Sequence, residues 1–133
     1  MARIKVGQIG ICHEHAAHKI EAIRRLPDVF EIVGVVDDRQ TSAAYRAVDD
    51  LSPYQGLAWL TEKQLLDTPG LDAVFVETPN TDLVPTAMRC MQRGISMHMD
   101  KPGGEDMNAF RALLDGCRQR GLAFQMGYMF RNN

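Results

Sequence analysis

The sequence lacks the features that mark several large classes of protein. Its three cysteines, Cys12, Cys90 and Cys117, form no CxxC pair and are odd in number, so we expect neither a disulfide framework nor a zinc knuckle. No apolar run approaches the roughly 18 residues that a membrane-spanning helix requires. The N-terminus leads directly into the charged, alternating stretch at residues 3–6, which is unlike a secretion signal. We therefore expect a cytoplasmic protein.

Clustered positive charge is also missing. Fifteen Lys and Arg residues against seventeen Asp and Glu residues give a formal net charge of −2, and no run of basic residues stands out. Binding to nucleic acid or to an anionic membrane needs basic side chains gathered on one surface. The sequence therefore predicts a small-molecule partner, with no nucleic acid and no membrane.

The chain instead alternates short apolar runs with longer amphipathic segments. The apolar runs predict strands at residues 4–11, 30–36, 56–60, 73–76, 95–99 and 122–128. The segments between them predict helices at residues 13–26, 41–51, 61–66, 83–93 and 105–120. About six strands alternating with helices indicate an α/β fold, a doubly wound parallel sheet of Rossmann-like type with helices on both faces. A chain of this length buries about two-thirds of its surface, so we expect residues 1–133 to form one domain.

The turn after the first predicted strand is the first candidate site, because ligands of such sheets bind outside the carboxyl ends of the strands. Here Gly10, Ile11, Cys12 and His13 should aim backbone N–H groups, and the positive end of the next helix, at a phosphate. Only the first glycine of a GxGxxG pattern is present, since Cys12 and His15 occupy the other two positions. The alternative interpretation is an ordinary turn between a strand and a helix.

Two acids and a base follow the second predicted strand. Asp37 is placed to accept hydrogen bonds from the ribose 2′- and 3′-hydroxyls of an adenosine, and it repels a 2′-phosphate. Asp38 adds to that repulsion, whereas Arg39 partly reverses it. These residues favour NAD as the cofactor and leave NADP open. The alternative is that Asp37 is a solvated residue in a turn.

The histidines at positions 13, 15 and 18 raise the question of a metal. The segment HEHAAH places Ala17 where an HExxH motif needs its second histidine. His15 and His18 share a helix face, yet no cysteine or carboxylate cluster completes a tetrahedral set of ligands. We therefore expect no metal.

Prolines follow the residues at the ends of the fourth and fifth predicted strands, in Thr78-Pro79-Asn80 and Asp100-Lys101-Pro102. Proline fixes its own φ and biases the preceding residue toward extended geometry, so Thr78 and Lys101 should be held stiffly at the edge of the sheet. An ammonium group there can hydrogen-bond a substrate hydroxyl and assist its deprotonation during hydride transfer. The alternative is a surface lysine in a glycine-rich turn.

Taken together, these segments resemble the Gfo/Idh/MocA family of nicotinamide-dependent oxidoreductases, in particular its N-terminal cofactor domain. The most specific likeness is GISMHMDKP at residues 94–102, which is similar to the family's GKHVxxEKP segment. Thr78-Pro79-Asn80 resembles the family's TPN turn against the nicotinamide half of the cofactor, and GYMFRNN at residues 127–133 resembles its GYxxRxNP segment.

The resemblance implies a role for several of the candidate residues. Gly10 would be the glycine of the phosphate turn, Asp37 the acid that binds ribose, and Lys101 the lysine that contacts substrate and nicotinamide ribose, with Pro102 beside it. The intact enzyme would transfer a hydride to or from a secondary alcohol of a sugar, cyclitol or similar polyol, and an oligomer is possible.

The chain also departs from the family's pattern. Cys12 replaces a glycine, Leu83 stands where many members have histidine, and Asp100 replaces a glutamate. Family members continue into a second α/β domain that covers the substrate, whereas this chain stops at Asn133. We therefore expect the first domain of a longer, two-domain enzyme, inactive by itself.

Two other functions fit parts of the sequence. A non-catalytic module that binds a nucleotide or serves as an interaction platform would explain the incomplete glycine pattern. A methyltransferase also uses a glycine-rich turn and an acid after the second strand, but it has no role for Lys101-Pro102.

Overall fold

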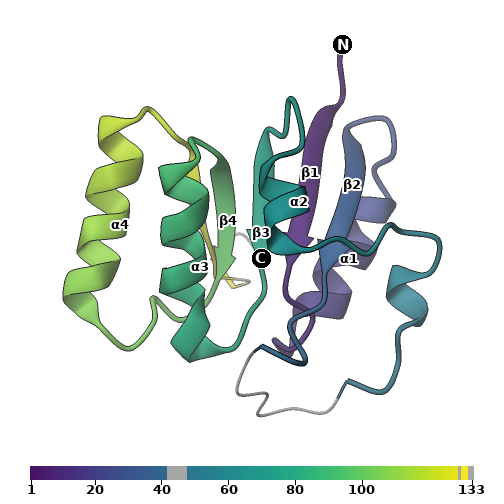
Figure 1. The fold of residues 1–133 in the computed structure, drawn as a ribbon, viewed down its shortest axis with the longest axis horizontal. Coiled ribbons are helices and arrows are strands. Elements are labelled where there is room, and N and C mark those ends of the chain that lie inside the picture. Colours follow the sequence, from purple (N-terminus) through teal and green to yellow (C-terminus); the bar gives the residue numbers. More distant parts are fainter. Residues whose placement is uncertain (42–47, 129, 132–133) are drawn as a thin grey trace.

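The computed structural model describes residues 1–41, 48–128 and 130–131. Within them the chain forms an α/β fold around one parallel sheet, with the strand order β2-β1-β3-β4-β5 (Figure 1). The strands are β1 (Ile4–Ile9), β2 (Phe30–Val36), β3 (Ala73–Val76), β4 (Ser96–Asp100) and β5 (Phe124–Gly127). The helices are α1 (Ala16–Arg24), the 3-10 turn η1 (Ser52–Tyr54), α2 (Glu62–Leu66), α3 (Asn80–Gln92) and α4 (Met107–Gln119).

Alternate strand residues supply two apolar clusters, one on each face of the sheet, because successive side chains of a strand point to opposite faces. On one face Val76 and Met99 pack with Leu83 of α3 and Leu113 of α4. On the other, the cluster contains strand residues of β1 and β2 together with residues of α1 and η1, namely Val6, Val35, Ile20, Ile23 and Tyr54. Helices thus cover both faces, which confirms the doubly wound arrangement.

The predicted strand at residues 56–60 is wrong, and the sheet has five strands rather than six. Only one parallel bridge forms there, between Val35 of β2 and Trp59. Two backbone hydrogen bonds support it, from Val35 to the Ala58 carbonyl and from Leu60 to the Val35 carbonyl, each 2.9 Å long. The segment is short because the chain turns at once into α2, where Thr61 forms a capping box with Gln64.

The other predicted elements are confirmed with shifted ends. The strand at residues 30–36 and the strand at residues 73–76 match β2 and β3. The helix expected at residues 83–93 begins earlier, at Asn80, directly after Pro79 as its N-cap. Most of the helix predicted at residues 41–51 lies outside the described residues, and the described part, residues 41 and 48–51, is not helical. All three cysteines are buried and free of disulfides. In the described part of the chain, no helix has the length and apolar character needed to cross a membrane.

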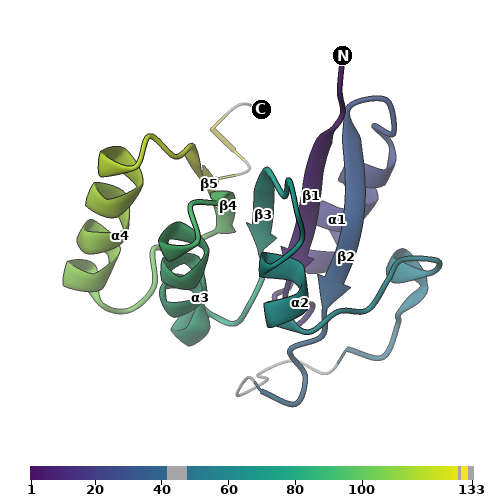
Figure 2. The same cartoon turned by 45° about the horizontal axis from the view of Figure 1, so that its top comes forward.

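The carboxyl ends of the strands lie along one edge, since all the pairings are parallel. Figure 2 shows β1, β2 and β3 ending on the same side of the molecule. The chain crosses from β1 to β2 in one direction and reaches β3 on the other side of β1. The strand order therefore reverses between β1 and β3, which is where open α/β sheets bind ligands.

Gly10 fixes how closely the turn after β1 approaches the end of β3. Its φ is +99°, and a Cβ added there would lie 2.6 Å from the backbone C and O of Glu77. Only glycine fits both the backbone conformation and the space. Gly10, which the sequence predicts to bind a phosphate, is therefore needed for the close packing of this turn against the end of β3 as well.

Replacing Gly10 with alanine should cost about 3 kcal/mol or more of unfolding free energy, because positive φ and a backbone clash add together. Gly94→Ala is the matched control, since Gly94 also has positive φ (+72°) but no atom within 4 Å of an added Cβ. We expect a loss of about 1 kcal/mol for the control. Urea denaturation measures both, and equal losses would contradict the proposed role of the close approach.

Candidate functional site

The backbone N–H groups of the β1–α1 turn donate to acceptors inside the protein. Asp38 Oδ1 accepts from Ile11 N at 2.8 Å and from Cys12 N at 3.2 Å, and the Glu77 carbonyl accepts from His13 N at 3.1 Å. The sequence predicted that such groups would be aimed at a phosphate. In the structure they instead hold the turn against the ends of β2 and β3.

Asp38 and Asp37 therefore have different surroundings although they are neighbours. Both line one cavity, but Asp38 is buried at 3% exposure under the turn, whereas Asp37 is partly exposed and forms an ion pair with Arg39. Arg39 Nε lies 3.0 Å from each Asp37 oxygen. This hydrogen bond with Arg39 holds the pKa of the Asp37 carboxyl below its usual value. Asp37 is thus a fixed, ionised acceptor.

A cavity of about 790 Å³ joins the end of β2 to the start of α3. Asp37, Arg39 and Thr78 line it, together with Trp59 and Asp82. The Thr78 hydroxyl is buried and has no hydrogen-bond partner in the described part of the chain. Because buried polar groups are almost always hydrogen-bonded, this hydroxyl points to a ligand or water as its partner. The size and mixed lining of the cavity suit a small molecule.

Lys101 is held through its backbone as well as its side chain. Its N–H donates to Asp100 Oδ1 at 2.7 Å, and its carbonyl accepts from His13 Nε2 at 3.1 Å. Its ammonium donates to Glu14 Oε1 at 3.0 Å. This hydrogen bond with Lys101 lowers the pKa of Glu14. Pro102 follows, joined by a cis peptide bond, so the stiffness expected from proline is accompanied by two backbone contacts.

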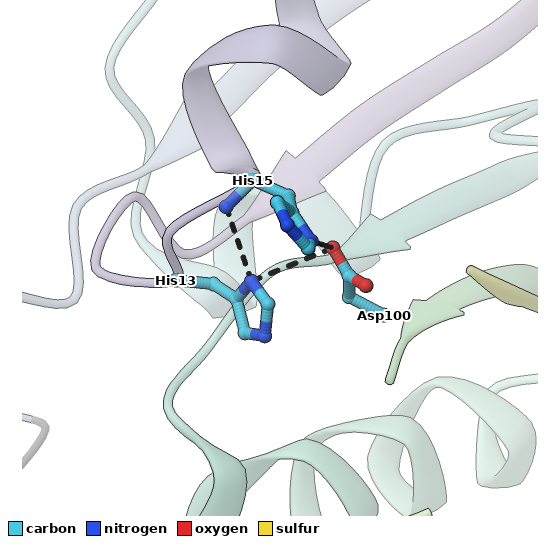
Figure 3. Close-up of side chains that lie close together, drawn as sticks. All are labelled: His13, His15 and Asp100. Carbon is cyan, nitrogen blue, oxygen red and sulfur yellow. Dashed lines mark hydrogen bonds and ion pairs between the residues drawn. The ribbon is translucent and has the colours of Figure 1, made fainter. Parts of the chain in front are cut away.

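Sequence reasoning missed a buried group of ionisable side chains beneath Lys101. His13 and His15, from the turn before α1, both face Asp100 at the end of β4 (Figure 3). Asp100 Oδ2 lies 3.4 Å from His13 Nδ1 and 3.1 Å from His15 Nδ1. Glu77, at the end of β3, places Oε2 at 3.9 Å from His13 Nδ1. The exposed fraction of the Glu77 side chain is 0%, and that of His13 and Asp100 is 1%.

Burial and mutual repulsion separate the pKa values of the two carboxyls. Burial, and after it the charge of Asp100, together raise the pKa of Glu77 to about 9. Burial also acts to raise the pKa of Asp100, but hydrogen bonds from Glu77 and the Lys101 N–H lower it on balance. Burial lowers the pKa of His13. The pair therefore needs one proton or another cation to be stable.

The sequence predicts no metal because no cysteine or carboxylate cluster completes a ligand set with the histidines. In the structure carboxyl groups do lie beside them, because Glu77 and Asp100 reach His13 and His15 from other strands. His18, which shares a helix face with His15, is exposed and lies outside this group. A hint was available in AVFVE, since a charged residue directly after a buried apolar strand is unusual.

Cys12 is not a reactive thiol in this structure. It is buried at 0% exposure, and burial raises its pKa to about 12, with the Asp38 hydrogen bond adding to the shift. It occupies the second glycine position of the expected phosphate turn as a small apolar residue.

Comparison with known proteins identifies a family for this chain. A sequence profile of the Gfo/Idh/MocA group, an oxidoreductase family with an NAD-binding Rossmann fold, matches residues 4–128. The match covers nearly the whole sequence, and it agrees with the Rossmann-like fold that the element order predicted.

Solved structures share the same fold. They include GenD2 from gentamicin A biosynthesis in complex with NAD, with 21% identity and a TM-score of 0.79 over 96% of this chain and 35% of that one. UDP-N-acetylglucosamine 3-dehydrogenase GnnA from Acidithiobacillus ferrooxidans has 22% identity and a TM-score of 0.73 over 98% of this chain and 40% of that one. An NAD-binding protein from Listeria innocua has 19% identity and a TM-score of 0.74, covering 95% and 35%. This chain thus spans 35% to 40% of the length of those three.

The different surroundings of the two aspartates lead to a stability test. Asp38→Ala leaves the N–H groups of Ile11 and Cys12 without their acceptor, so we expect a loss of about 2–5 kcal/mol of unfolding free energy. Asp37→Ala removes a partly exposed ion pair and should cost less than about 1 kcal/mol. Chemical denaturation compares the two variants. A larger loss for Asp37→Ala would show that the burial of Asp38 is not what holds the turn.

Proposed function

Because the chain belongs to the Gfo/Idh/MocA oxidoreductase family, we propose that residues 1–133 form the dinucleotide-binding domain of a longer NAD-dependent enzyme. The observation that carries the proposal is the placement of Asp37, Thr78 and Lys101 along one carboxyl edge, on either side of the reversal in strand order. Strand spacing separates the ends of β2 and β4 by roughly 14 Å, a distance suited to an extended dinucleotide.

The adenosine half lies in the cavity beside Asp37 in this proposal. The Asp37 carboxylate accepts hydrogen bonds from the ribose hydroxyls, and Arg39 orients it. Asp37 and Asp38 both carry negative charge toward a 2′-phosphate, so NAD is favoured over NADP. Gly10, Ile11, Cys12 and His13 form the floor under the phosphates, near the positive end of α1.

The nicotinamide half lies toward β3 and β4. Thr78 offers its unpartnered hydroxyl, with Pro79 and Asn80 beside it at the start of α3, and Asp100 and Pro102 flank Lys101 on the other side. When bound, nicotinamide supplies the hydride acceptor or donor. Lys101 lies at this end, where its ammonium can hydrogen-bond a substrate hydroxyl; once the ammonium has given up a proton, the neutral amine can take the proton that the hydroxyl loses.

Glu14 bears on how Lys101 would work. Its carboxylate accepts from the Lys101 ammonium, and both side chains are partly exposed, 48% for Glu14 and 38% for Lys101. A substrate hydroxyl therefore approaches an ammonium oriented by Glu14, and the Glu14 carboxylate is the acceptor to which the ammonium can pass its own proton before it takes one from the substrate.

We further propose a sugar, cyclitol or similar polyol as substrate. Support comes from the resemblance of the Asp100-Lys101-Pro102 segment to the family's EKP motif. Two proteins of similar structure add to it, one a UDP-N-acetylglucosamine 3-dehydrogenase and one from gentamicin A biosynthesis.

Cofactor binding is tested by titrating the chain with NADH and NADPH, followed by fluorescence and calorimetry. Asp37→Ala should weaken NADH binding by about 10-fold or more, because the ribose loses a charged acceptor. NADPH should be affected less, since Arg39 is then free to pair with the 2′-phosphate. Asp115→Ala, which removes an exposed acid of α4, is the control and should change neither affinity.

The absence of NADH binding by the folded wild-type chain would overturn the proposal. Equal weakening of NADH and NADPH in Asp37→Ala would overturn the placement of the adenosine ribose.

Catalysis by Lys101 is tested in the longer enzyme. Lys101→Met should lower kcat by about 100-fold or more, because proton transfer in the transition state is lost. The change in NADH affinity should be much smaller than the change in kcat. Lys63→Met is the control, since Lys63 is an exposed residue of α2 and should leave kcat unchanged. Wild-type turnover in Lys101→Met would overturn the catalytic role of this lysine, whereas NADH binding without turnover in the unmodified longer protein would favour a non-catalytic module.

A further inference from the structure

The hydrogen bonds of His13 determine which of its ring nitrogens carries a proton. Nε2 lies 3.1 Å from the Lys101 carbonyl, which can only accept, so Nε2 must be protonated. Nδ1 accepts from the backbone N–H of His15 at 3.2 Å. A neutral His13 therefore has no proton on Nδ1 to offer Asp100 Oδ2 or Glu77 Oε2, which lie 3.4 Å and 3.9 Å from it.

Glu77 contributes an independent observation at the same place. Its side chain is fully buried, and no donor of another described residue reaches either carboxylate oxygen, so its one hydrogen bond is the one that a proton on Glu77 makes to Asp100. The nearest ammonium, Lys19 Nζ, lies 3.9 Å from Oε1 and is 2.6 Å from His98 Nε2. Oε2 instead faces His13. The carboxyl oxygens of Glu77 and Asp100 thus converge on a buried place beside His13, where either a proton between them or a cation balances their charge.

We propose that His13, His15, Glu77 and Asp100 form a binding site for a divalent transition metal ion, with Zn²⁺ as the ion whose coordination fits. Two imidazoles and two carboxylates are common zinc ligands, and the two carboxylates balance the charge of the ion. The site goes beyond the proposed oxidoreductase function and does not require a nicotinamide cofactor.

The distances are close to those of a tetrahedral site. Zinc binds nitrogen and oxygen at roughly 2.0–2.2 Å, which separates neighbouring ligand atoms by about 3.4 Å. The observed separations are 3.4 Å from Asp100 Oδ2 to His13 Nδ1, 3.1 Å to His15 Nδ1, and 3.9 Å from His13 Nδ1 to Glu77 Oε2. The ligand atoms of His13, His15 and Asp100 all lie within 4.8 Å of one another. Glu77 lies outside that group of three, so the movement that closes the four ligands around one ion is mainly a movement of Glu77 toward Asp100 and His15.

Each histidine also has an acceptor behind its other ring nitrogen, as ligating histidines usually do. His13 Nε2 donates to the Lys101 carbonyl, and His15 Nε2 lies 3.5 Å from Glu14 Oε1. His15 is 21% exposed, whereas the other three are almost fully buried, so an ion would enter past His15. Once bound, the ion would join the β1–α1 turn to the ends of β3 and β4.

The experiment measures Zn²⁺ binding to the metal-free chain by competition with a chromophoric chelator, without nicotinamide. The wild-type chain should bind one Zn²⁺, and its melting temperature should rise with Zn²⁺ concentration. Co²⁺ in place of Zn²⁺ should give the intense visible absorption of a four-coordinate site.

Three variants separate ligation from folding. His15→Asn removes a ligand at a partly exposed position and should lower Zn²⁺ affinity by at least about 10-fold. His18→Asn changes the same residue type on the exposed part of the same helix and should bind as the wild type does. Glu77→Gln keeps the side-chain volume, removes a charged ligand and should also weaken binding, with circular dichroism confirming the fold.

Three results would overturn the proposal: no stoichiometric Zn²⁺ binding by the wild-type chain, equal affinities of His15→Asn and His18→Asn, or a weak Co²⁺ spectrum of six-coordinate type. In each of these cases the cation that balances Glu77 and Asp100 is a proton. None of the three results bears on NADH binding, which is measured separately.

Discussion

Two buried carboxylates at the ends of neighbouring strands set the requirements for the rest of the carboxyl edge. Glu77 and Asp100 are withdrawn from water, and an uncompensated charge there costs several kcal/mol. His13 and His15, from the turn before α1, lie beside Asp100, and Lys19 of α1 lies beside Glu77, so both carboxyls have a basic neighbour. Because His13 also donates to the Lys101 carbonyl, the position of Lys101 depends on how these charges are balanced.

The same edge separates structural acids from acids that face open space. Asp38 Oδ1 accepts hydrogen bonds from two backbone N–H groups, and Glu77 is buried. Asp37 and Glu14 are instead partly exposed and form ion pairs with Arg39 and Lys101. The family's cofactor would contact the second kind. Burial therefore decides which acids are able to recognise a ligand and which hold the turns that surround it.

Much of the fold could be predicted from local pattern. The apolar runs at residues 30–36 and 73–76 identified β2 and β3, and Thr61 marked the start of α2. The segment at residues 56–60 looked like a strand, but pairing depends on a neighbour and on the path to α2, which a local pattern does not contain.

The site was predictable only in part. The order of elements was enough to place Asp37, Thr78 and Lys101 at one edge. It could not show that Asp38 would take the N–H groups of the turn, nor that Glu77 would approach His13, since these contacts join residues more than 20 positions apart. Such contacts arise from the packing of strands that are distant in sequence.

Under the proposed function, cofactor selectivity would have one fixed component, which is the buried Asp38, and one adjustable component, which is the pair of Asp37 and Arg39. Asp37 and Arg39 lie at the surface, so substitution can retune them at little expense in stability. The charge of Asp38 cannot be removed without freeing the backbone groups it holds, and it stays beneath the adenosine side of the edge whatever residue stands at position 37. A variant that changes Asp37 and Arg39, whether natural or engineered, would therefore keep the negative potential of the Asp38 carboxylate.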